Sequence, residues 1–134
     1  MIFLNGVVGW NKATASTLPN FFSFQLSNEI KKKYKNVGLI FARNVIPHVK
    51  NIHSIVKGVS NLSNTSTICA IEFHYSKHII KELQYDSIYH EHLFYFSIET
   101  ISGLFAKYNL HPFDVFASPI SGGSLVLLFS KDKK

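Results

Sequence analysis

Two histidines, a carboxylate and a phenol follow one another at Tyr89-His90-Glu91-His92. The chain has only eight acidic residues and seven histidines in 134 residues, so chance is a poor explanation for this cluster. Tyr, His and Glu are also side chains that transfer protons near neutral pH. We therefore take this segment as the first candidate for a catalytic site.

The order of the four residues leaves more than one chemistry open. In a regular strand, Tyr89 and Glu91 would lie on one face and His90 and His92 on the other. A site that joins Tyr89 to His92 therefore requires an irregular backbone. Such a site could remove a proton beside a carbonyl group, with Glu91 orienting a histidine. The alternatives are a polar surface turn or a metal site that includes His74, although the histidine spacing matches no strong zinc motif.

Further polar residues follow two predicted strands. Segments 37–41 and 67–73 are short apolar runs without alternation, as expected of strands that are buried on both faces of a parallel sheet. Ligands of such sheets bind at the carboxyl ends of the strands. Four polar residues lie at these ends or just after them: Asn44, His48, Glu72 and His74.

The hydrophobic pattern predicts an α/β fold. Apolar residues at every fourth position predict an amphipathic helix over 22–34, and a second helix is predicted over 49–59. The order helix, strand, helix, strand indicates parallel strands joined by crossovers. Ser97 is expected to cap a later helix. The other predicted elements are a short helix over 76–83 and strands over 113–116 and 125–129.

The composition indicates a folded chain. Hydrophobic residues make up 46% and charged residues 16%, which argues against disorder. The net charge of +6 comes mostly from lysine, and a solvated surface explains it better than a nucleic-acid site does. Cys69 is the one cysteine, so an intramolecular disulfide and a multi-cysteine zinc site are excluded, and we expect no bound metal. No apolar run is long enough to span a membrane, and we expect a soluble cytoplasmic chain with neither a membrane nor a nucleic-acid partner.

The segment Tyr85–Leu93, followed by Tyr95-Phe96-Ser97, resembles the core of the S-adenosylmethionine-dependent sugar C-methyltransferases. These enzymes act on nucleotide-linked keto-deoxysugars. The resemblance extends roughly over residues 20–130, and the Tyr-His-Glu-His block is its most specific part. Other matching motifs occur in the family's order: Phe21-Phe22, Asn44-Val45, His48-Val49, Glu72-Phe73 and Ser121-Gly122-Gly123-Ser124-Leu125.

The resemblance implies methyl transfer from S-adenosylmethionine to the carbon beside the sugar ketone. It implies that His92 takes the proton from that carbon and that Tyr89 and Glu91 assist. His48 would lie near the sugar. The resemblance also assigns cofactor contacts to Phe21, Asn44 and Val45, and substrate contacts to His90, Glu72, Gly122 and Gly123.

The chain also departs from the family. It has neither the cysteine-rich zinc-binding region nor a Gly-x-Gly cofactor loop, and Arg43 stands where the family usually has a small or amide residue. We therefore expect the C-terminal half of such an enzyme. Residues 1–83 would form a partial Rossmann-like class I methyltransferase sheet, and residues 84–134 would form a small α+β domain on the substrate side.

Two hypotheses about function follow. The first is a C-methyltransferase, which a second chain would complete. The second is a truncated and inactive relic, or a module that binds a nucleotide-sugar or a protein partner. A nucleic-acid binder is a weaker third interpretation. A sheet without its first strands would have an unpaired edge, so we also expect self-association or a partner chain.

Overall fold

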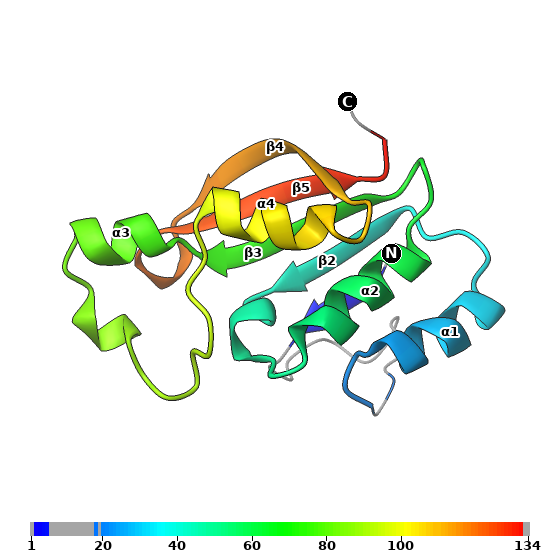
Figure 1. The fold of residues 1–134 in the computed structure, drawn as a ribbon, viewed down its shortest axis with the longest axis horizontal. Helices are drawn as coiled ribbons and strands as arrows, with labels where there is room; N and C mark the ends of the chain where they lie inside the picture. The colour runs from blue at the N-terminus through cyan, green and yellow to red at the C-terminus, as the bar shows by residue number, and fades with distance from the viewer. Residues whose placement is uncertain (1, 6–17, 19, 133–134) are drawn as a thin grey trace.

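The computed structural model describes residues 2–5, 18 and 20–132, and its strands form one mixed sheet with the order β1-β2-β3-β5-β4 (Figure 1). Strands β1, β2 and β3 are parallel, and β5 is antiparallel to both of its neighbours, β3 and β4. The α/β fold class predicted from the sequence is therefore confirmed. The strands are β1 (Ile2–Asn5), β2 (Leu39–Arg43), β3 (Ile68–His74), β4 (His111–Ser118) and β5 (Ser124–Ser130).

The helices lie close to where the apolar spacing predicts them. Ser23 caps the first helix, because its hydroxyl accepts a hydrogen bond from the amide of Leu26. Ser97 forms a capping box with Thr100 at the start of α4, as the sequence predicts. The helices are α1 (Phe24–Lys33), α2 (Ile52–Leu62), α3 (Ser76–Lys81) and α4 (Ile98–Ala106), and the 3-10 turns are η1 (Ile46–His48), η2 (Tyr85–Ser87) and η3 (Ile120–Gly122).

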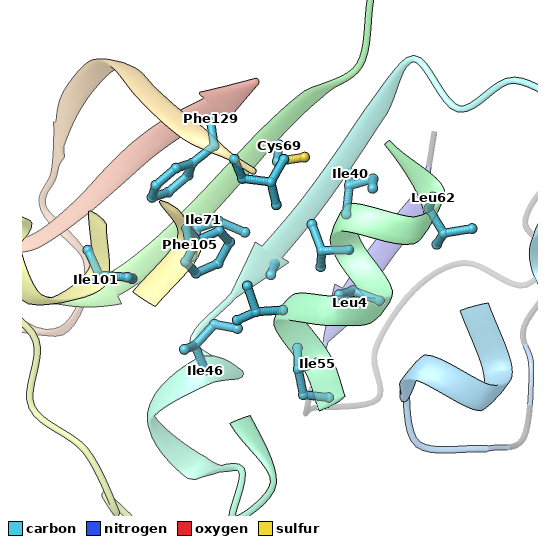
Figure 2. Close-up of a cluster of buried hydrophobic side chains, with 14 of the residues drawn as sticks. Leu4, Ile40, Ile46, Ile55, Leu62, Cys69, Ile71, Ile101, Phe105 and Phe129 are labelled. Carbon is cyan, nitrogen blue, oxygen red and sulfur yellow. The ribbon is translucent and has the colours of Figure 1, made fainter. Parts of the chain in front are cut away.

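Helices α2 and α4 cover one face of the sheet, and the apolar core lies beneath them (Figures 1 and 2). Phe105 of α4 stacks on Phe129 of β5 with 4.3 Å between the ring centroids, and both side chains are fully buried. Ile71 of β3 is fully buried as well, while α2 contributes Ile55 and Leu62. This packing holds the carboxyl ends of β2 and β3 at one edge of the sheet.

The chain leaves the sheet at the end of β3 and returns to the same place. After α3 and η2, Phe96 forms a parallel bridge with Tyr75, and the amide of Ser76 donates to the Phe96 carbonyl at 2.9 Å. Residues 84–95, which we call the site segment, therefore form an excursion from the carboxyl end of β3.

The strands that follow the site segment extend the same sheet. Because β5 pairs with β3, the predicted boundary at residue 83 falls between two parts of one sheet. Strands β1 and β4 form its two edges in the part of the chain that the structure describes, and the association expected at such edges stays a prediction. Among the helices of the described residues, none combines the length and the apolar character that a membrane span requires.

Candidate active site

The site segment turns sharply at the Tyr-His-Glu-His block. The amide of His92 donates to the carbonyl of Tyr89 at 3.0 Å. This turn brings the Tyr89 hydroxyl to 3.2 Å from Nε2 of His92, and the two rings lie 4.3 Å apart between centroids. The backbone is thus irregular where a joint site of Tyr89 and His92 requires it to be.

Backbone carbonyls determine which nitrogen of two histidines carries the proton. Nδ1 of His92 lies 2.8 Å from the carbonyl oxygen of Ser87. Nδ1 of His48 lies 2.9 Å from the carbonyl oxygen of Glu91. Because a carbonyl only accepts, each Nδ1 is the donor, and each neutral ring has its lone pair on Nε2. The Tyr89 hydroxyl is therefore the donor to Nε2 of His92.

His92 lies at the centre of a cluster of aromatic rings. The His48 ring is 4.7 Å from it between centroids, the Tyr95 ring 6.0 Å and the His74 ring 6.5 Å. His74 is buried, whereas His48 and His92 are half-exposed. The cluster therefore combines two half-exposed histidines with one that the fold encloses.

The cluster forms because the site segment docks on the turn after β2. The carbonyl of Pro47 accepts from the amides of both Leu93 (2.9 Å) and Phe94 (3.2 Å). Since Pro47 belongs to η1, these two bonds bring the site segment against the turn that carries His48. The carboxyl ends of β2 and β3 thus supply neighbouring parts of one site, as expected of a parallel sheet.

Glu72 has protein partners for both carboxylate oxygens. Its Oε2 lies 3.3 Å from Nε of Arg43, and its Oε1 accepts from the hydroxyl of Ser118 at 2.9 Å. The Glu72 residue is only 2% exposed, so this pairing compensates a buried charge. Arg43, which departs from the family pattern, is thus the counter-ion of Glu72. The substrate contact assigned to Glu72 stays a prediction.

The residues predicted to contact cofactor differ in their exposure. The Phe21 residue is 99% exposed. Asn44 follows β2 in the left-handed region, with φ of 47°, and its amide donates to the Glu72 carbonyl at 3.2 Å. Val45 is half-buried and packs against the core.

The other predicted site residues are two exposed side chains and two glycines with positive φ. His90 is exposed, and its ring lies 6.3 Å from that of Tyr89. The side chain of Glu91 is also exposed, and it is the Glu91 carbonyl that contacts His48. Gly122 and Gly123 have φ of 71° and 123°, which L side chains rarely adopt.

Sequence reasoning missed the groups that hold the site together. The carbonyls of Pro47 and Ser87 have no signature in a sequence, because every residue has a carbonyl group.

Tyr95 and Gln84 were also not assigned as site residues. An apolar hollow of about 220 Å³ borders Tyr95, and its lining is Ser76, Ile79, Ile80, Ile88 and Tyr95.

The histidines are not arranged as metal ligands. Among the described residues, no group of three or more His, Cys, Asp or Glu side chains could hold a metal ion. The metal-site interpretation of the Tyr-His-Glu-His block therefore has no support in the geometry. The proton-transfer interpretation has the Tyr89–His92 contact in its favour.

The chain is similar in sequence to a curated C-methyltransferase. No family model matches the chain. Over 117 residues the chain is 31% identical to C-methyltransferase NovU from Streptomyces niveus. The aligned residues cover 87% of this chain and 28% of that protein. The chain thus spans less than a third of the length of this curated relative.

Solved structures share the fold at low sequence identity. A SAM-dependent methyltransferase from Thermotoga maritima, described as a possible histamine N-methyltransferase, matches with a TM-score of 0.56 at 14% identity, over 71% of this chain and 56% of that one. Magnesium protoporphyrin IX methyltransferase from Synechocystis PCC 6803, solved with bound SAH, matches with a TM-score of 0.53 at 9% identity, over 72% of this chain and 46% of that one. The chain therefore shares part of the Rossmann-like fold of these methyltransferases. The predicted resemblance to C-methyltransferases is confirmed by the sequence match to NovU.

Proposed function

We propose that the chain is part of a SAM-dependent C-methyltransferase that acts on a nucleotide-linked keto-deoxysugar, and that His92 is its base. The observation that carries the proposal is the state of the His92 ring. Its Nδ1–H donates to the Ser87 carbonyl, so the lone pair of the neutral ring is on Nε2, next to the Tyr89 hydroxyl. A neutral imidazole held in one orientation is a suitable general base near neutral pH.

The proposed step begins at the carbon beside the sugar ketone. Nε2 of His92 takes the proton, and the electron pair of the broken C–H bond passes to the ketone oxygen to give an enolate. The Tyr89 hydroxyl turns from Nε2 to this oxygen and stabilises its negative charge by donating a hydrogen bond. The enolate carbon would then attack a methyl group, whose bond to sulfur breaks as the sulfur keeps the electron pair of that bond. When bound, S-adenosylmethionine supplies that methyl group on a positively charged sulfur.

His48 and Glu91 have supporting roles in this proposal. The His48 ring stands 4.7 Å from the His92 ring, and its Nε2 lone pair can accept a hydrogen bond from a sugar hydroxyl. Glu91 contributes its backbone carbonyl, which orients His48. The exposed Glu91 carboxylate and the exposed His90 ring remain able to contact a substrate from the solvent side.

Three of the described residues support the proposal that this chain contacts the cofactor. The exposed ring of Phe21 offers a face on which an adenine ring can stack. Asn44 and Val45 follow the carboxyl end of β2, the edge at which ligands of open α/β sheets bind. These three residues would hold the cofactor, while His92 and Tyr89 act on the sugar.

The proposed base can be tested without methyl transfer. The purified chain is incubated in D₂O with a nucleoside-diphosphate 4-keto-6-deoxyglucose, and NMR follows the proton signals of the carbons beside the ketone. We expect the chain to exchange one of these protons faster than buffer does. His92→Ala should return the rate to that of buffer, whereas the control His111→Ala, at the start of β4, should keep the wild-type rate. Equal rates for His92→Ala and wild type would rule out His92 as the base.

Cofactor binding is measured separately, by calorimetric titration of S-adenosylmethionine into the same chain. Binding in the micromolar range supports a cofactor site within this chain. Proton exchange without cofactor binding would mean that the base is present and that another chain segment is needed to hold the cofactor.

A further inference from the structure

Gln84 joins two parts of the fold that are distant in sequence. Its Oε1 lies 3.0 Å from Nε2 of His74, at the end of β3. Its Nε2 donates to the carbonyl of Gly122, in η3, at 2.8 Å. The side-chain amide therefore bridges the enclosed histidine of the cluster and the glycine loop before β5.

The two bonds determine each other's direction. The Gly122 carbonyl can only accept, so the atom of Gln84 that faces it must be the NH₂ group. The other atom of the amide is then the oxygen, which can only accept. Nε2 of His74 must therefore carry a proton, and the lone pair of the neutral His74 ring is on Nδ1. This argument does not depend on how the amide is assigned, because the carbonyl fixes it.

His74 is thus protonated on the opposite nitrogen from its two neighbours. His48 and His92 are held with the proton on Nδ1 by backbone carbonyls, and both present an Nε2 lone pair. His74 lies 6.5 Å from His92 between ring centroids and is only 8% exposed. Of the three histidines, it is therefore the one whose Nε2 is not available as a base.

The Gly122–Gly123 loop packs closely against the side chains of Gln84 and His78. A Cβ at Gly122 would lie 3.0 Å from Nε2 of Gln84, and a Cβ at Gly123 would lie 2.5 Å from Nδ1 of His78. Both glycines also have positive φ. The loop therefore lies against Gln84 and α3, and a larger side chain at either glycine would require Gln84 or His78 to move as well as a strained backbone.

We propose that Gln84 is a positioning residue, which holds His74 in its Nε2-protonated form and ties the Gly122–Gly123 loop to the histidine cluster. The inference rests on the proposed function and deepens it, because it leaves the base role to His92, with His48 beside it as the acceptor for a sugar hydroxyl. Neither the proton on Nε2 of His74 nor the fixed position of the Gly122–Gly123 loop requires that methyl transfer occurs.

The test is ¹⁵N NMR of the histidine rings, combined with amide hydrogen exchange, in three variants of the chain. Gln84→Met is similar in size and removes both hydrogen bonds. Gln84→Glu keeps an acceptor for His74 but has no donor for the Gly122 carbonyl. Glu82→Gln changes an exposed neighbour and serves as the control. Far-UV circular dichroism checks that each variant is folded.

We expect His74 of the wild-type chain to show a protonated Nε2 whose proton exchanges slowly with water. In Gln84→Met this exchange should become faster by about tenfold, the ratio that corresponds to one lost hydrogen bond, and the Gly123 amide should also exchange faster. In Gln84→Glu the Nε2 proton of His74 should still exchange slowly, because the carboxylate also accepts its hydrogen bond, while the Gly123 amide should exchange faster. Glu82→Gln should resemble wild type.

Two results would overturn the proposal. One is a neutral His74 with its proton on Nδ1 in the wild-type chain. The other is a slow Nε2 proton that persists in Gln84→Met. If Gln84→Met does not fold, Gln84→Glu alone tests the proposal. Slow exchange of the Gly123 amide in that variant would contradict the role of the hydrogen bond to the Gly122 carbonyl. None of these signals depends on proton exchange in a sugar, so a failure of the proposed function remains distinguishable.

Discussion

The core beneath α4 and the site segment are held by different forces. Phe105 and Phe129 are fully buried and stack at 4.3 Å, so apolar burial and ring packing hold this region. The site segment has exposed apolar side chains, Ile88 at 60% and Leu93 at 41%, and its position depends on hydrogen bonds to backbone carbonyls, including that of Pro47. Stability should therefore depend mainly on the core, while a side chain of the site segment can change with little loss of fold.

The largest expected effect is on the core side of this comparison. Phe105→Ala removes a ring that is 0% exposed and leaves a cavity beside Phe129, so it should lower the free energy of unfolding by about 3–5 kcal/mol. Urea denaturation measures this loss. The control Lys107→Ala alters an exposed side chain after α4 and should change the free energy by less than about 0.5 kcal/mol. A loss below about 1 kcal/mol for Phe105→Ala would mean that this stack is not the main source of stability.

A smaller effect should appear as a pH dependence that arises in the core. Burial raises the pKa of the Cys69 thiol to about 11 from its ordinary value of 9.0, although the Ser63 hydroxyl and the Lys131 charge partly oppose the shift. Above pH 9 the unfolded chain therefore loses this proton while the folded chain keeps it. The stabilisation is complete below pH 9 and is lost as the pH approaches 11, by about 2–3 kcal/mol.

The measurement is urea unfolding at several pH values with Cys69→Ala as the reference. Other groups also titrate in this range, and the difference between wild type and variant isolates the thiol. We expect the two stability curves to approach each other as the pH rises from 9 to 11. Parallel curves over this range would show that the thiol titrates alike in the folded and unfolded chains.

The same contrast explains which features could be predicted from the sequence. Helices follow from apolar spacing and caps, so α1, α2 and α4 were found, together with the Ser97 cap. The pairing of β5 between β3 and β4 could not be foreseen in the same way, because it depends on contacts between segments far apart in the chain. Local periodicity carries no information about such a partner.

The candidate site was predictable in its residue types but not in its construction. Tyr89 and His92 stand out because four residues that could transfer protons follow one another at 89–92. The carbonyls that orient His92 and His48 belong to Ser87 and Glu91, and only the folded backbone brings them there. The diglycine was interpreted as a ligand contact, and the structure gives it a conformational and packing reason as well, since both residues have positive φ and an added Cβ would displace Gln84 or His78.

The smallest expected change in stability lies on the site side. His92→Ala removes one hydrogen bond to the Ser87 carbonyl and one contact with the Tyr89 hydroxyl, both from a half-exposed ring. A bond of this kind contributes about 1 kcal/mol, and the amides of the site segment would still donate to Pro47, so we expect a loss of less than about 1 kcal/mol in urea denaturation. Tyr89→Phe, which removes only the hydroxyl, should change stability still less. A loss for His92→Ala as large as that for Phe105→Ala would mean that the histidine ring belongs to the core. A small loss would leave the His92 ring as a side chain that the fold holds in place but does not need, as expected of a residue whose role is chemical.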